Sequence, residues 1–431
     1  MSGLELDERE QRRNFRLAVW NGVLFQAAES CIDPGTVVPV LVARLGASNV
    51  LIGLASAMSD MGWLLLQILV VPRASRLPRQ LRLYRVAAVL RAVGLLAVAA
   101  LAIPFANRPG AVLAVFFSGY ALYSFAAGAG AVAFMEVVGR TIAPHRLTPL
   151  WSRRFLWGGL LAAALALGVR HVLDAQDAAH AMAILFGGAL LFAAVGWAMF
   201  ARVREPDHPV TPSPDAVTLL RRGFALLRTD TDFRRLLAAR SVLHVWFAAV
   251  PFVVLFAVRD LDGGGRAAGT FLLLRIAGFV LGNLVWPPLA RAQGNRALMI
   301  AGTWLAGLLG LAAAAVALAS PAGRGWIGAT PAIVALETLA FFGGVAHSGL
   351  SVGYSSLSIE LAPPGERQAF FSLLNTFLGP TLLLPAIAGA LLDVTSAPVL
   401  FALCGALALW GSRAAMKLPR PAALAGARAT A

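Results

Sequence analysis

Long apolar runs recur along this chain and restrict its fold more than any other feature. Examples are residues 86–104, 111–135, 181–200 and 301–320. A helix of ~20 apolar residues spans the ~30 Å hydrocarbon core of a bilayer, where only helices and closed barrels satisfy every backbone polar group. Of the 431 residues, 59% are hydrophobic and 13% are charged, whereas a soluble protein carries about 25% charged residues. The sequence therefore predicts an all-α integral membrane protein.

The apolar runs divide into twelve predicted transmembrane helices. Most basic residues lie in the segments on one side of these helices, and basic residues are enriched in cytoplasmic segments. We therefore expect both termini to be cytoplasmic in a multi-pass protein of the inner membrane. This asymmetry also explains the net charge of +15 without a nucleic-acid partner. The twelve spans are placed at 15–43, 50–71, 84–104, 111–138, 154–173, 180–201, 235–258, 268–289, 297–319, 326–359, 369–391 and 396–416.

A polar segment at 202–234 separates six spans from the next six. Its prolines prevent a continuous helix, but an amphipathic helix that lies on the membrane surface is expected from Asp215 onward. We therefore predict two six-helix halves, 1–201 and 235–431, joined by this cytoplasmic linker.

The two halves share landmarks that indicate a duplication. I-A-P-H-R-L-T-P-L-W-S-R-R-F (142–155) follows the fourth span of the first half, and L-A-P-P-G-E-R-Q-A-F-F-S-L-L (361–374) follows the fourth span of the second half. Pro72 and Pro288 similarly follow the second spans. Parallel six-span repeats occur in one large transporter architecture, and we expect Pro144 to correspond to Pro364.

The twelve spans, the basic linker and the parallel repeat resemble the major facilitator superfamily over essentially the whole chain. The loop V-P-R-A-S-R-L-P-R-Q (71–80) keeps Arg76 and Arg79 of the superfamily's loop between spans two and three. It lacks the aspartate and glycines that are usual there. The resemblance implies alternating access, with spans one, four, seven and ten around a central cavity. It fixes no substrate, and the sequence shows no catalytic motif, metal-ligand spacing or cofactor fingerprint.

Ionisable residues within spans are candidate functional residues because a charge in the membrane is costly unless it is paired or hydrated. In F-Q-A-A-E-S-C-I-D-P-G (25–35), Glu29 and Asp33 lie four residues apart on one helix face, and Pro34-Gly35 should kink the helix. Glu337 and His347 occupy the tenth span. A histidine titrates near neutral pH. All four are candidates for binding protons or substrate.

Other charged residues within or at the ends of the predicted spans are expected to form ion pairs with one another. Asp60 is expected to pair with Arg91 or Arg275, between which the sequence does not decide. Glu136 and Arg140 are spaced for an ion pair at the end of the fourth span, as a gate or a structural contact. Arg76 and Arg79 complete the candidate gating charges. Hydrogen-bonding and aromatic side chains that could contact a substrate are Gln26, Tyr120, Tyr123, His244, Trp246, Tyr354 and Asn375.

These features favour a monomeric secondary active transporter, with proton-coupled efflux of a small organic solute as the first hypothesis. The alternatives are proton symport of a polar metabolite and, in a different class, a lipid-handling membrane protein. An enzyme is not expected, because no internal helix face combines a nucleophile with a base or carries metal ligands.

Overall fold

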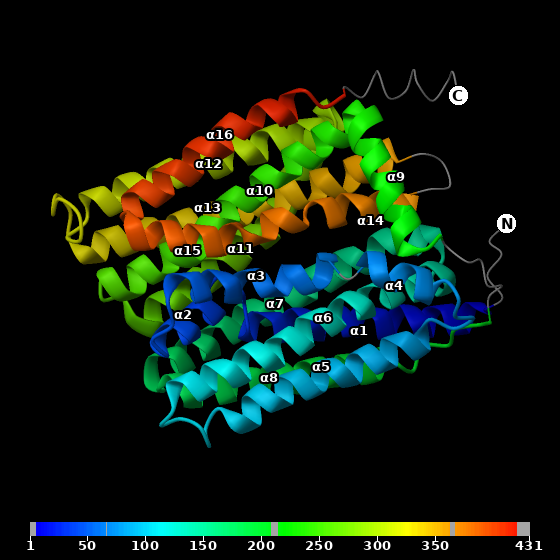
Figure 1. Ribbon diagram of the computed structural model, residues 1–431. Helices are drawn as coiled ribbons and strands as arrows, with labels where there is room; N and C mark the ends of the chain where they lie inside the picture. Colours follow the sequence, from blue (N-terminus) through cyan, green and yellow to red (C-terminus); the bar gives the residue numbers. More distant parts are fainter. Residues whose placement is uncertain (1–5, 66, 208–213, 363–366, 420–431) are drawn as a thin grey trace. The chain divides into compact units, whose positions relative to one another are not determined.

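Regular structure in this protein is helical throughout the part that the computed structural model describes, residues 6–65, 67–207, 214–362 and 367–419 (Figure 1). The chain divides into two compact units. Unit 1 comprises Met1–Ala47 and Met58–Ala216, and unit 2 comprises Ser48–Ala57 and Val217–Ala431. The predicted second span therefore contributes to both units, since its residues up to Ala57 belong to unit 2 and those from Met58 belong to unit 1. The predicted halves, 1–201 and 235–431, remain a prediction.

The helices follow the predicted spans closely. Those up to the linker are α1 (Glu8–Cys31), α2 (Val37–Arg44), α3 (Asn49–Leu65), α4 (Gln67–Ala74), α5 (Leu81–Leu101), α6 (Pro109–Thr141), α7 (Pro144–Ala175) and α8 (Ala178–Phe200). Those after it are α9 (Ala216–Thr229), α10 (Thr231–Leu255), α11 (Gly264–Gln293), α12 (Asn295–Ala319), α13 (Ala329–Leu361), α14 (Arg367–Phe377), α15 (Leu384–Val394) and α16 (Ala397–Met416). A π-helical turn, Phe256–Asp260, continues α10, and a 3₁₀ turn, Gly379–Leu383, joins α14 to α15.

Ten helices within the described residues are long and apolar enough to cross a membrane. The predicted first and eleventh spans are not among them. α1 is 24 residues long but carries polar side chains such as Asn14, Arg16 and Asn21, whereas the eleventh span is divided into shorter helices. Pro34 and Gly35, where the sequence predicted a kink, lie in a break between α1 and α2. The eleventh span was expected to be continuous, but it contains the 3₁₀ turn. Pro380 lies in this turn and Pro385 at the start of α15, and each lacks a backbone donor. The chain is thus a multi-pass membrane protein, while twelve spans, cytoplasmic termini and a monomeric state remain predictions.

The two units repeat the same neighbour relations, as a duplication requires. In unit 1, α1 packs on α7 and α8, while α5 packs on α6 and α8. In unit 2, α10 packs on α15 and α16, while α12 packs on α13 and α16. Pro72 in α4 and Pro288 in α11 lie near the ends of corresponding helices. Pro364 lies outside the described residues, so its correspondence with Pro144 stays untested.

Glycine allows a close helix approach in unit 1. At the crossing of α5 and α6, Gly94 faces Gly119, and a Cβ atom on Gly119 would lie 2.7 Å from the Gly94 carbonyl oxygen. Small residues permit such approach between helices in a membrane, where packing rather than water exclusion drives association. On α5, exposed apolar side chains recur at helical spacing, at Val86, Val89, Val93 and Leu96, and provide a surface suited to lipid.

The linker helix is present where the sequence predicted it. α9 buries Leu219 and Gly223, while Arg221 and Arg222 are exposed. Asp230, between α9 and α10, caps α10 by accepting hydrogen bonds from the backbone N–H groups of Asp232 and Phe233. A side-chain acceptor here replaces the missing intrahelical partners of the first turn.

Candidate functional site

A buried arginine lies halfway along α5 in unit 1. Arg91 belongs to α5, and only 6% of its surface is exposed. Its guanidinium carbon lies 4.6 Å from the ring centroid of Trp197, 4.8 Å from that of Tyr123 and 5.7 Å from that of Phe25. Aromatic faces attract a cation, and more strongly where water is excluded. The side chain is therefore held by rings from α1, α6 and α8.

Tyr123 connects Arg91 to a carboxylate. Nη2 of Arg91 donates to the Tyr123 hydroxyl oxygen at 3.0 Å, and that hydroxyl donates in turn to Oε1 of Glu29. We call Glu29, Tyr123 and Arg91 the α1–α5–α6 chain. Two charges of opposite sign thus meet through a phenol, which lets each charge make a hydrogen bond inside the protein. The hydrogen bond between Glu29 and Tyr123 thus joins two groups of candidate residues predicted from the sequence, the acids of the first span and the tyrosines of the fourth.

Two further carboxylates contribute to the electrostatics at Glu29, namely Asp33 and Asp60, together with Arg91. Asp33 is buried, and its Oδ1 accepts hydrogen bonds from Gly35 N at 3.0 Å and Thr36 Oγ1 at 2.8 Å. Asp33 therefore shapes the break between α1 and α2. Asp60 is exposed in unit 1, and its pairing with Arg91 or Arg275 stays a prediction.

Next to the α1–α5–α6 chain, further aromatic residues follow one another along α6. Tyr120 stacks on Tyr123 with ring centroids 5.9 Å apart, and Phe116 stacks on Tyr120 at 5.3 Å. These residues are spaced at helical intervals, so they share a face of α6. Gln26 lies on α1 against Gly158 of α7.

Unit 2 contains a second cluster, which is basic and aromatic. The guanidinium of Arg240 on α10 lies 4.5 Å from the ring centroid of Tyr354 on α13. The Tyr354 hydroxyl donates to Asn375 Oδ1 at 3.1 Å. Both Tyr354 and Asn375 are buried. We call this group, with the residues of the next paragraph, the α10–α13 cluster.

The histidines and Trp246 complete the α10–α13 cluster. His244 Nδ1 lies 2.5 Å from Thr381 Oγ1, and His347 packs edge-on against Phe247 and Phe279. Among the residues that the structure describes, Nε1 of buried Trp246 has no hydrogen-bond acceptor. Arg240, Arg275 and His244 are the ionisable groups around His347. Glu337 lies half-buried on α13.

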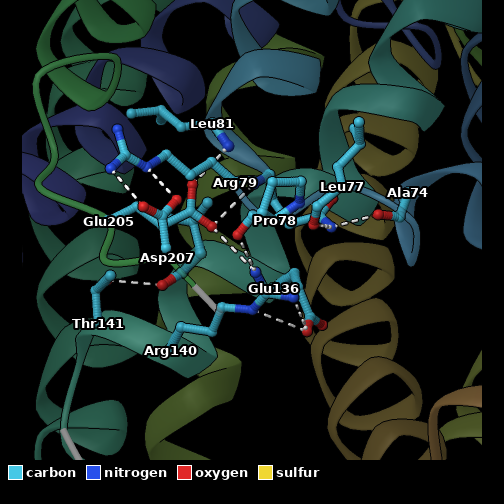
Figure 2. Close-up of polar contacts among 12 residues, drawn as sticks. Ala74, Leu77, Pro78, Arg79, Leu81, Glu136, Arg140, Thr141, Glu205 and Asp207 are labelled. Atoms are coloured by element: carbon cyan, nitrogen blue, oxygen red, sulfur yellow. Dashed lines mark hydrogen bonds and ion pairs between the residues drawn. The ribbon is translucent and has the colours of Figure 1, made fainter. Parts of the chain in front are cut away.

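A third polar group lies at the ends of α4, α5, α6 and α8 in unit 1 (Figure 2). Arg140 donates to Glu136 Oε1 at 3.1 Å, which forms the pair predicted from their spacing. Arg140 also lies 3.3 Å from Glu205 Oε1. The same Glu205 carboxylate accepts the backbone N–H groups of Gln80 at 2.9 Å and Leu81 at 2.8 Å. Glu205 therefore caps the start of α5.

The two arginines of the loop 71–80, Arg76 and Arg79, differ in their contacts. Arg79 makes a two-fold hydrogen bond with Asp207, at 2.7 and 2.9 Å, on the exposed side of this group (Figure 2). Arg76 is exposed. The group thus joins the loop 71–80 to the end of α6 and the segment after α8, all within unit 1.

Sequence reasoning did not identify Glu205, nor a buried network around Arg154. Nη1 of Arg154 on α7 donates to Ala18 O at 2.6 Å and to Asn21 Oδ1 at 3.4 Å. Asn21 Nδ2 donates to the Tyr84 hydroxyl and to Gly196 O, each at 3.0 Å. Gly22 leaves room for the guanidinium. The only available signal was the presence of Asn21 within an apolar run.

No match was found among curated protein sequences. The family described as MFS/sugar transport protein matches residues 151–360. Among solved structures, a POT family transporter in complex with 5-aminolevulinic acid is similar at a TM-score of 0.70 and 13% identity, covering 94% of this chain and 95% of that one.

Two further similar structures are of transporters for other substrates. The nucleoside transporter NupG has a TM-score of 0.66 at 14% identity, with 95% of this chain and 99% of that chain covered. A D-xylose–proton symporter has a TM-score of 0.66 at 15% identity, covering 95% and 98%. These similarities show that the chain has the fold of these solved transporters, and the family match over residues 151–360 agrees with the resemblance to the major facilitator superfamily.

Proposed function

We propose that this protein exports a small organic solute in exchange for protons, by alternating access. The observation that supports this most is the α1–α5–α6 chain. It places one carboxylate, Glu29, among helices that span the membrane and gives its ionised form a partner. Intramembrane carboxylates of this kind are typical of proton pathways.

Glu29 is suited to alternate between two charge states. As a carboxylate, it accepts the Tyr123 hydroxyl, which is polarised by Arg91. A proton on Glu29 removes one negative charge beside a buried cation and weakens that link. Asp33 is less suited, because its Oδ1 already holds the turn before α2. We therefore assign the coupling proton to Glu29, with Glu337 as the second candidate.

The α10–α13 cluster supplies the groups that we assign to the solute. Arg240 and Tyr354 offer a cation and a ring, and Trp246 offers an unused indole donor among the described residues. Apolar and aromatic linings with a few polar groups are typical of small-molecule sites. An amphipathic solute with an aromatic or acidic part fits this chemistry.

Proton symport of a polar metabolite is the second candidate. It is favoured by the family match, whose description includes sugar transport, and by the similarity to a D-xylose–proton symporter. The two candidates differ in the direction in which protons accompany the solute.

Proteoliposomes distinguish these candidates whatever the orientation of the protein. A panel of labelled metabolites and amphipathic compounds is offered to vesicles with an acidic lumen or an acidic exterior. Exchange for protons accumulates the solute only with an acidic lumen, whereas symport does so only with an acidic exterior. Glu29→Gln should abolish accumulation in either case and leave solute–solute exchange intact.

Glu10→Gln is the matched control for that substitution. Glu10 lies on the same helix as Glu29 but pairs with Arg204, outside the predicted span. It should respond to the gradient as the wild type does. Solute flux that responds to neither gradient in the wild type would show a uniporter or another coupling ion.

A further inference from the structure

Four arginines line one cavity of unit 1. The cavity has a volume of about 630 Å³ and is lined by Arg12, Phe15, Arg16, Arg146, Pro149 and Arg153. Three of these residues belong to α1 and three to α7. None of them belongs to the α1–α5–α6 chain, the α10–α13 cluster or the group around Glu205.

Helical spacing explains why these side chains meet. Arg12, Phe15 and Arg16 are spaced by three and one residues, so they share a face of α1. Arg146, Pro149 and Arg153 are spaced by three and four residues on α7. The two helices pack against each other, which brings both basic faces to one cavity.

The charge of this cavity is only partly balanced. Glu8 supplies one carboxylate, which pairs with Arg12 at 2.6 Å and with Arg146 at 3.2 Å. Within the part of the chain that the structure describes, neither Arg16 nor Arg153 forms an ion pair. The Arg153 guanidinium instead lies 5.4 Å from the ring centroid of Phe15. Two guanidinium groups therefore remain available to an anion.

The cavity lies where α1 and α7 are predicted to enter the membrane. The predicted first span begins at residue 15, and the apolar part of α7 begins at Pro149. The arginines thus lie at the polar ends of both helices, beside an apolar wall of Phe15 and Pro149. Arginine forms two parallel hydrogen bonds with a phosphate group, and basic residues beside spans attract anionic lipids.

We propose that this cavity binds the phosphate group of an anion whose other part is apolar, and that an anionic phospholipid headgroup is its source in the membrane. Arg16 and Arg153 hold the phosphate, while Phe15 and Pro149 contact the start of the acyl region. Free phosphate shares the same chemistry, so the experiment separates the two sources.

The test uses the full chain in nanodiscs of phosphatidylcholine, with or without phosphatidylglycerol. Lipid retained by the protein is measured by native mass spectrometry, and inorganic phosphate is titrated into the phosphatidylcholine discs while thermal unfolding is followed. Arg16→Gln with Arg153→Gln should weaken phosphatidylglycerol binding by about fivefold for each arginine removed. Arg82→Gln with Arg413→Gln removes the same charge from exposed positions elsewhere and should retain the wild-type affinity.

Arg16→Lys with Arg153→Lys keeps both charges and checks the fold, so it should retain most of the lipid binding. Stabilisation by inorganic phosphate that is lost only in the Arg16 and Arg153 glutamine variant would support the site with a soluble source. Equal lipid and phosphate binding by the glutamine variant and the control would overturn the proposal.

Discussion

The replacement of Glu205 by alanine tests how the end of unit 1 is held together. The Glu205 side chain is 1% exposed, and its two oxygens accept the backbone N–H groups of Gln80 and Leu81 and lie beside Arg140. Alanine removes all three interactions at once. The two donors at the start of α5 are buried and would lose their partner.

The magnitude follows from these contacts. A hydrogen bond to a charged group contributes roughly 1.5–3 kcal/mol, and removing one partner of a buried ion pair costs about 3–5 kcal/mol. Arg140 keeps Glu136 at 3.1 Å, so part of its interaction survives. We therefore expect Glu205→Ala to lower the free energy of unfolding by about 3–5 kcal/mol. Glu205→Gln keeps one acceptor oxygen and should cost about half as much.

Asp207 provides the matched control two residues away. It also bonds an arginine, Arg79, but the side chains are 68% and 49% exposed, and exposed ion pairs contribute little. Unfolding in mixed micelles, followed by tryptophan fluorescence, compares Asp207→Ala with Glu205→Ala. Equal losses of stability in the two variants would refute the capping role assigned to Glu205.

Three further predictions concern unit 1. Gly119→Ala places a Cβ 2.7 Å from the Gly94 carbonyl oxygen and should cost ~1–3 kcal/mol of stability by overpacking. The control Gly110→Ala, on the same helix, meets nothing within 4 Å and should not destabilise the protein. A lower melting temperature for Gly110→Ala than for Gly119→Ala would contradict this packing. Asp177 caps α8, and hydrogen bonding from the backbone of His180 lowers the pKa of Asp177. Because the pKa is lower in the folded state, the cap stabilises the protein at pH values above the usual aspartate range, so Asp177→Ala should cost ~1 kcal/mol of stability at neutral pH. This difference in stability should shrink as the pH falls through that range, and a pH-independent difference would count against the cap. Tyr123→Phe keeps Glu29 but removes its hydrogen-bond donor, so gradient-driven transport should persist with a shifted pH midpoint; an unchanged pH profile would show that the link has no role in proton binding.

Local features were predictable from the sequence. The helix break at Asp33–Gly35 follows from adjacent proline and glycine, and the pair between Glu136 and Arg140 follows from their spacing. The linker helix and the spans follow from apolar periodicity. The break between α14 and α15 was equally local, at Gly379 and Pro380, but the long apolar run obscured it.

Contacts distant in sequence were not predictable in the same way. Arg91 was expected to need a partner, and formal charge suggested an aspartate. Arg91 donates a hydrogen bond to Tyr123, 32 residues away, because a phenol can bridge two charges that do not touch, while its pairing with Asp60 stays a prediction. Glu205 meets Gln80 across 125 residues, and no spacing rule relates them. Only the packing of α5, α6 and α8 brings those groups together.

Simultaneous measurement of proton and solute fluxes in reconstituted vesicles tests the role of Glu29 most directly. With a pH-sensitive dye in an acidic lumen, wild-type solute entry should be accompanied by proton exit. Glu29→Gln should exchange solute across the membrane with no accompanying proton movement, because no titrating group remains at that position. Proton exit coupled to solute entry in Glu29→Gln, at the wild-type ratio, would contradict the assignment of the coupling proton to Glu29.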